Sequence, residues 1–112
     1  MIPRANRLRD SKEFRHISRS GRKHRTSSVV ISATNSKNQE DRFGFVVPKR
    51  VGNAVKRNLA KRRLRAVCFE IIQTPFGLDV VLRAEKPILD LSFEELKSEV
   101  TEGLNSLRSK IK

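Results

Sequence analysis

The 112-residue sequence contains no tryptophan, no tyrosine and a single cysteine, Cys68. A lone cysteine excludes an intrachain disulfide and a zinc cluster, so we expect Cys68 to be a small buried apolar residue. The sequence has no run of about 18 apolar residues, and its first residues are too polar for a signal peptide. The length is that of one domain, over residues 1–112, and the missing apolar segments predict that it lies in the cytoplasm with no membrane partner.

Patterns of protein-based catalysis are also missing. His16 and His24 have no aspartate, glutamate or cysteine at metal-ligand spacing, and no nucleophile motif surrounds the serines. The acidic residues near the C-terminus follow the outer face of a predicted helix and form no general acid–base pair: Glu94, Glu95, Glu99 and Glu102. We therefore predict no catalytic residue and no metal ligand in this chain.

Acidic residues are scarce in the first part of the chain. The formal net charge is +13, from 25 basic and 12 acidic residues. Residues 1–25 carry a net charge of +7 and residues 49–65 carry +8 with no acid, whereas residues 66–112 carry −2. One surface must therefore be strongly basic, which is typical of proteins that bind nucleic acid.

The most basic segment, residues 51–67, has the spacing of a helix. Arg57, Lys61 and Arg65 recur every four residues and form one column, with Asn58 and Arg62 in the adjacent column. A separate apolar stripe, suited to burial, is formed by Ala60, Leu64, Val67 and Ile71. Because like charges one turn apart repel, this arrangement indicates that a polyanion binds across the helix.

Capping and strand signals predict the order α-β-β-α-β-α, an α+β fold. Asp10 begins a helix over residues 11–20, Asn53 begins the basic helix over residues 54–73, and a Ser92–Glu95 capping box begins the C-terminal helix. Strands are predicted over residues 28–34, 42–47 and 78–83, the first two forming a hairpin. Alternation makes one sheet face fully apolar, for covering by helices, and leaves the other half polar, bordered by the helix that carries Phe14.

These residues resemble the protein component of bacterial ribonuclease P. The resemblance rests on Gly52-Asn-Ala-Val-x-Arg-Asn-x-x-Lys-Arg-x-x-Arg65, on Phe14 within its N-terminal segment, and on Phe43-Gly-Phe-Val-Val-Pro-Lys-Arg50 and Leu78-Asp-Val-Val-Leu-Arg83. It covers nearly the whole chain in the family's order. It implies a small α/β sandwich with a central, mainly antiparallel sheet, helices on one face and a left-handed β-α-β crossover, against the usual right-handed preference.

The resemblance also implies a function, as a subunit of a ribonucleoprotein endoribonuclease. The protein would bind the ribonuclease P RNA, one protein per RNA, and the 5′ leader of precursor tRNA, while the RNA carries catalysis with Mg²⁺. The implied RNA-subunit contacts are Lys49, Arg50, Asn53, Arg57, Asn58, Lys61, Arg62 and Arg65. The implied leader contacts are Phe14, Arg15, Ile17, Arg19, Ser32 and Arg83.

The chain departs from the family's pattern at two positions of the leader cleft. Ser18 and Ser32 stand where the family often has aromatic residues, so we expect leader binding to depend more on arginines and on salt. Charge alone would equally suit a ribosomal or general RNA-binding protein without a processing role. A DNA-binding protein is disfavoured, because a strand rather than a helix precedes the basic helix.

Overall fold

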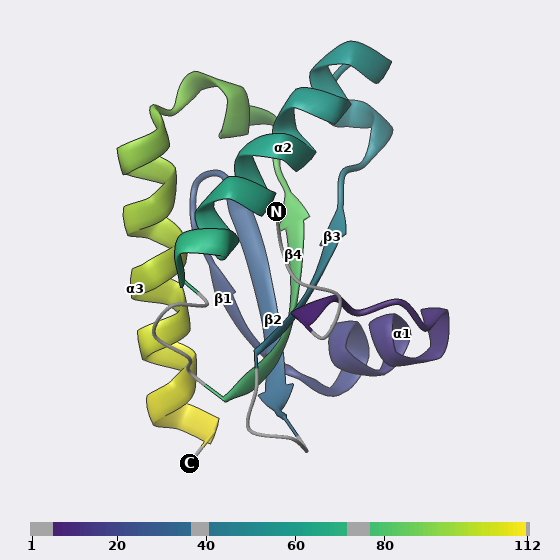
Figure 1. The fold of residues 1–112 in the computed structure, drawn as a ribbon, viewed down its shortest axis with the longest axis vertical. Coiled ribbons are helices and arrows are strands. Elements are labelled where there is room, and N and C mark those ends of the chain that lie inside the picture. The colour runs from purple at the N-terminus through teal and green to yellow at the C-terminus, as the bar shows by residue number, and fades with distance from the viewer. Residues whose placement is uncertain (1–5, 37–40, 72–76, 112) are drawn as a thin grey trace.

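The computed structural model describes residues 6–36, 41–71 and 77–111 (Figure 1). In these ranges the elements are, in chain order, α1 (Ser11–Ser20), β1 (Arg22–Arg25), β2 (Val29–Asn35), β3 (Arg42–Val46), η2 (Lys49–Val51), α2 (Ala54–Ile71), β4 (Leu78–Ala84), η3 (Lys86–Asp90) and α3 (Phe93–Ile111), where η marks a 3₁₀-helix. No helix in the described ranges is both long enough and apolar enough to span a membrane. The predicted end of α2, residues 72–73, lies outside the described residues.

The sheet has the order β1-β2-β4-β3 and is mainly antiparallel, as predicted. Two expectations were wrong. The strands β2 and β3 form no hairpin, because β4 inserts between them, antiparallel to β2 and parallel to β3. The strand β1 was not predicted, because its sequence Arg-Lys-His-Arg has no apolar alternation and pairing with β2 alone places it in the sheet.

The parallel pair β3 and β4 is joined through α2. In Figure 1 both strands point upward, β3 lies to the right of β4 and α2 passes in front of them. The crossover is therefore left-handed, as the resemblance implied and against the usual preference. The helix α2 runs from the end of β3 toward α3, beside which it ends (Figure 1).

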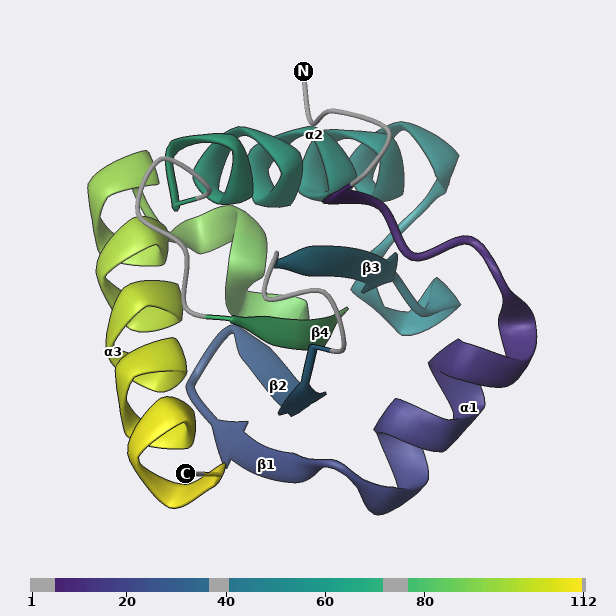
Figure 2. The ribbon, with the colours of Figure 1, turned by 60° about the horizontal axis from the view of Figure 1, so that its bottom comes forward.

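Helices lie on both faces of the sheet (Figure 2). The expectation of helices on one face holds for α2 and α3, which share the main core with Phe43, Val80 and Leu82 of the strands. The helix α1 packs instead on the opposite face, where Ile17 forms a small cluster with Leu8 and Val81. The half-polar face is thus partly covered, by one short helix.

The predicted capping signals are all in place. Asp10 accepts a hydrogen bond from the Lys12 amide at 2.9 Å, and the Asn53 side chain accepts one from the Lys56 amide at 3.0 Å. Ser92 and Glu95 exchange hydrogen bonds of 2.9 and 3.1 Å, which completes the capping box of α3. Cys68 is fully buried, and burial raises the pKa of its thiol, as suits an inert core residue.

Gly103, a poor helix former inside α3, has a packing role. A Cβ atom there would stand 2.5 Å from Ile31 Cδ1 and 3.0 Å from His24 Cδ2. The glycine therefore lets α3 approach β1 and β2 closely. His24 is half-buried against this helix, because β1 carries it onto the core face of the sheet.

Two contacts fix α1 on the half-polar face. The Phe14 ring lies where a side chain at Gly44 would stand, so only glycine at this position of β3 leaves room for it. Arg42 donates hydrogen bonds of 2.9 and 2.8 Å to the buried Asp79 and one of 2.6 Å to Glu13 of α1. The bonds to Asp79, together with that to Glu13, raise the pKa of Arg42 although burial opposes them, so this guanidinium stays charged.

The Gly44–Phe14 contact yields a prediction for stability. We expect Gly44→Ala to lower the free energy of unfolding by about 1–3 kcal/mol, because the new methyl group overlaps the Phe14 ring. In a Phe14→Leu background the same substitution should be clearly less damaging. Urea unfolding of the two single variants and the double variant measures this coupling. An equal loss in both backgrounds would show that the ring is not what Gly44 accommodates.

A second contact joins the turn before β2 to α3. Glu99 accepts hydrogen bonds of 2.9 Å from Ser27 and 2.7 Å from Ser28. Burial raises the pKa of Glu99, but the hydrogen bonds from Ser28, Thr26 and Ser27 together outweigh it, so the pKa is lower than usual. A carboxylate with a depressed pKa in the folded state stabilises the protein only while it is ionised.

We therefore expect Glu99→Gln to lower stability at neutral pH by on the order of 1 kcal/mol. The stabilisation is present above the ordinary glutamate pKa and is lost as pH falls through the lowered folded-state value. The difference between wild type and variant should accordingly shrink in acid, which melting curves from neutral pH down to about pH 3 would follow. Glu102→Gln, on the exposed side of α3, is the control. A difference that is constant with pH would exclude this role for the carboxylate.

Candidate nucleic-acid interface

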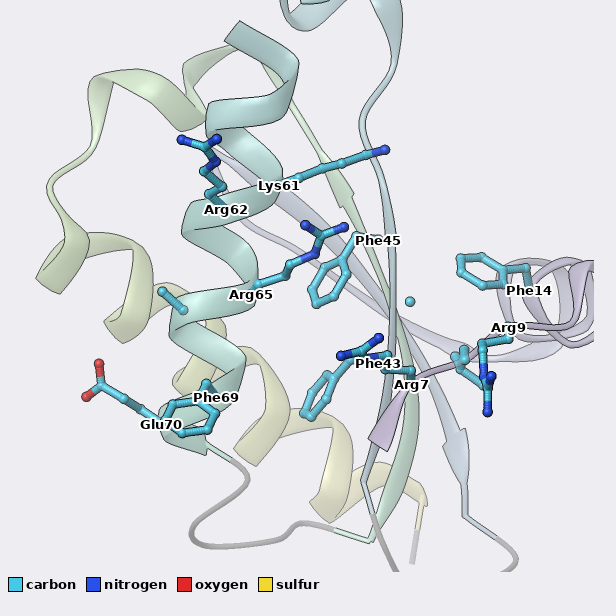
Figure 3. A pocket seen from close by; sticks show the side chains of 13 residues that line it. Arg7, Arg9, Phe14, Phe43, Phe45, Lys61, Arg62, Arg65, Phe69 and Glu70 are labelled. Atoms are coloured by element: carbon cyan, nitrogen blue, oxygen red, sulfur yellow. The ribbon is translucent and has the colours of Figure 1, made fainter. Parts of the chain in front are cut away.

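A groove of about 800 Å³ runs along the outer edge of the sheet, between α2 and the segment that precedes α1 (Figure 3). Its floor is β3, the edge strand. Its walls carry basic and apolar side chains together: Arg7, Leu8, Arg9, Phe14, Phe43, Gly44, Phe45, Lys61, Arg62, Arg65, Ala66, Phe69 and Glu70. The groove thus brings together residues from four separate parts of the sequence.

The wall formed by α2 provides cations. Lys61 and Arg65 extend from α2 toward β3, and the Arg65 guanidinium lies beside the Phe45 ring (Figure 3). The acidic lining residue Glu70 is paired with Lys97 of α3 at 2.9 Å. The cations of this wall therefore have no acidic partner in the groove itself, and the apolar stripe on the opposite side of α2 is buried as predicted.

Four phenylalanines line the groove, although the sequence has no tyrosine or tryptophan. Phe45 and Phe69 are partly exposed, Phe43 forms the base, and Phe14 lies beyond Gly44 at the far end. Sequence reasoning identified Phe14 alone. The signal for Phe69 was its spacing, because it stands one turn after Arg65 in the column of Arg57, Lys61 and Arg65.

The opposite wall comes from residues 7–9, which sequence reasoning did not assign to a site. Arg7 pairs with Phe43 as an isolated parallel bridge, and the Leu8 amide donates to the Phe43 carbonyl at 2.9 Å. Leu8 is buried while Arg7 and Arg9 are exposed. The Arg-Leu-Arg alternation was the available signal, since a strand places such neighbours on opposite faces.

The remaining predicted RNA-subunit contacts lie at the start of α2. Lys49, Arg50 and Asn58 are exposed, and Asn53 is exposed but engaged as the helix cap. Arg50 donates to Glu85 at 2.9 Å, and this bond lowers the pKa of Glu85. Arg57 is half-buried with its Nε out of solvent, so it is less exposed than Arg65.

The predicted leader contacts are divided between separate places. Phe14 lines the groove, whereas Arg15 and Arg19 lie on the outer side of α1 beside a shallow pocket of about 350 Å³. Arg83 lies at the η2 end of the half-polar face, 3.6 Å from Glu85. Ile17 and Ser32 are only 2% and 5% exposed, because Ile17 lies on the side of α1 that packs on the sheet and Ser32 lies within the sheet, so they support the surface rather than form it.

Within the described residues, no group of three or more histidine, cysteine, aspartate or glutamate side chains could hold a metal ion. The groove also presents no histidine, serine or cysteine among its lining residues. The groove presents positive charge beside aromatic rings. In proteins that bind single-stranded nucleic acid, positive charge attracts the phosphates and aromatic rings stack on the bases.

The fold and the groove together define a small basic α/β protein with a surface for a polyanion. The family model for ribonuclease P matches residues 2–108. The chain belongs to this family. The ribonuclease P protein component of Clavibacter michiganensis is 37% identical, over 96% of this chain and 100% of its own. That of Kocuria rhizophila is 42% identical, over 86% of each chain.

Solved structures of the family share the fold. The Staphylococcus aureus ribonuclease P protein superposes with a TM-score of 0.77 at 26% identity, covering 91% of this chain and 94% of that one. The Thermotoga maritima protein gives a TM-score of 0.74 at 26% identity, covering 92% and 96%. The α+β architecture predicted from the sequence is therefore that of known family members.

The exposed cations of α2 lead to a prediction about salt dependence. We expect Arg62→Gln with Arg65→Gln to weaken binding of a single-stranded RNA oligonucleotide and to reduce the slope of log K against log salt by about 0.7 per cation. Both side chains are exposed, so the melting temperature should stay unchanged. Titrations at several salt concentrations measure the slope. Arg108→Gln on α3 is the matched control, and equal slopes for all three proteins would exclude α2 from the interface.

Proposed function

We propose that this chain is the protein subunit of ribonuclease P, one per RNA subunit, and acts with that RNA to remove the 5′ leader of precursor tRNA. The observation that carries the proposal is the groove at the edge of β3, where cations of α2 and residues 7–9 flank four phenylalanines. A single-stranded leader offers phosphates to the cations and bases to the rings. Base stacking on an aromatic ring contributes roughly 1–3 kcal/mol per base.

The two expected RNA partners would meet on adjacent sides of α2, and Arg62 lies at the border between them. The leader would lie in the groove against Lys61, Arg65 and Phe14, and the RNA subunit would contact the exposed residues Asn58 and Arg62 and the η2 cations. Arg15, Arg19 and Arg83 would extend the leader surface beyond Phe14. Stacking of leader bases on the phenylalanine rings would make leader binding less dependent on arginine than the sequence alone suggested.

The chain itself would bind the two RNA molecules and position them relative to each other. Its cations would offset the repulsion between two RNA molecules, and the groove would hold precursor more tightly than product, because the product has no leader. Chemistry would be supplied by the RNA subunit, with magnesium ions bound to that RNA activating the attacking water. The protein alone should not cleave.

The decisive experiment is cleavage of precursor tRNA by a bacterial ribonuclease P RNA at low magnesium, with and without this protein. We expect cleavage at the mature 5′ end only when both are present, because the protein reduces the need for magnesium to screen the phosphates. The protein alone is the control for contaminating nuclease. Intact RNA binding without any rescue of cleavage would make the chain a general RNA-binding protein instead.

A further inference from the structure

The outer surface of α2 is not uniformly polar. Val55 is 77% exposed and Leu59, one turn further on, is 42% exposed. Ala66, eleven residues or three turns after Val55, is also exposed but lines the groove, so this side of the helix meets the groove there. We call Val55 and Leu59 the outer strip. It is separate from the buried stripe, which faces the sheet and α3.

The charges around the outer strip restrict what can cover it. Asn58 and Arg62 lie along one side, and Lys56 lies along the other. The helix carries one acidic residue, Glu70, which is paired with Lys97 at the far end. A second copy of this chain would place a strip of equal positive charge against the first, so self-association is disfavoured. The occupant must be anionic and must also offer apolar surface.

Unpaired nucleotides have both properties. A duplex turns phosphates outward and keeps its base faces stacked inside, so it would desolvate valine and leucine without an apolar partner. Unpaired nucleotides expose base faces and riboses next to their phosphates. We propose that the outer strip packs against unpaired nucleotides of the RNA subunit while Arg62 contacts their phosphates. This inference rests on the proposed function and adds the kind of RNA structure that α2 recognises.

Two variants separate the apolar contribution from the electrostatic one. Val55→Thr with Leu59→Gln removes apolar surface without changing charge or helix preference greatly. Arg62→Gln removes one charge and leaves the strip. Val46→Thr is the matched control, because Val46 is 37% exposed on β3, outside α2. Melting curves establish that all variants are folded.

The measurement is equilibrium binding to a bacterial ribonuclease P RNA over a range of salt concentrations. We expect the Val55/Leu59 variant to bind about tenfold more weakly at every salt concentration, with an unchanged slope of log K against log salt; tenfold corresponds to about 1.4 kcal/mol. Arg62→Gln should reduce the slope by about one. Val46→Thr should bind as wild type. Unchanged affinity of the Val55/Leu59 variant, or a loss confined to low salt, would overturn the inference.

Chemical probing of the bases tests the unpaired state. Wild type should protect a set of unpaired nucleotides in the RNA subunit, and the Val55/Leu59 variant should lose part of that protection. Protection confined to paired helices would overturn the inference while leaving the proposed function intact. Failure of the proposed function is seen separately, because wild type itself would then bind ribonuclease P RNA no better than bulk tRNA. In that outcome the outer strip has no RNA subunit to recognise, so both the proposed function and this inference would be wrong.

Discussion

The binding surface of this protein depends on cations that lie one helical turn apart along α2 and repel one another. Pairs such as Arg57 and Lys61 repel by roughly 0.2–0.5 kcal/mol each when they lie one turn apart. Burial of the opposite stripe outweighs this, because Leu64 and Val67 are fully buried and each such side chain contributes about 1.5–3 kcal/mol. The core thus stabilises a charge array that the isolated helix would not maintain. A surface of this kind is suited to a partner of opposite charge.

The edge strand β3 determines how that array is used. Its core face carries Phe43 and Phe45 toward α2, while Gly44 between them admits the Phe14 ring from the other face. Arg42 at the start of the strand ties α1 in place through Glu13 and Asp79. One five-residue strand therefore sets the distance between the cations of α2 and the aromatic end of the groove.

Local signals predicted most elements, and long-range pairing explains what they missed. The helix caps at Asp10, Asn53 and Ser92 were recognisable because each depends on a few neighbouring residues. The false hairpin came from sequence proximity, which carries no information about β4 inserting between two strands. Similarly, the charged side of α2 could be predicted from its spacing. Spacing also marks the Arg-Leu-Arg alternation of residues 7–9 and the place of Phe69 one turn after Arg65, but only tertiary packing brings these two parts of the chain together in one groove.

Under the proposed function, the protein would influence cleavage without supplying a catalytic group, because it would fix where two RNA molecules lie. Under the proposed function α2 serves both, with the leader on its groove side and the RNA subunit on its outer side. Its 18 residues form a rod of about 27 Å, anchored to the core by buried residues along its length. Because both RNA contacts arise from one rigid element, the separation between them cannot vary independently.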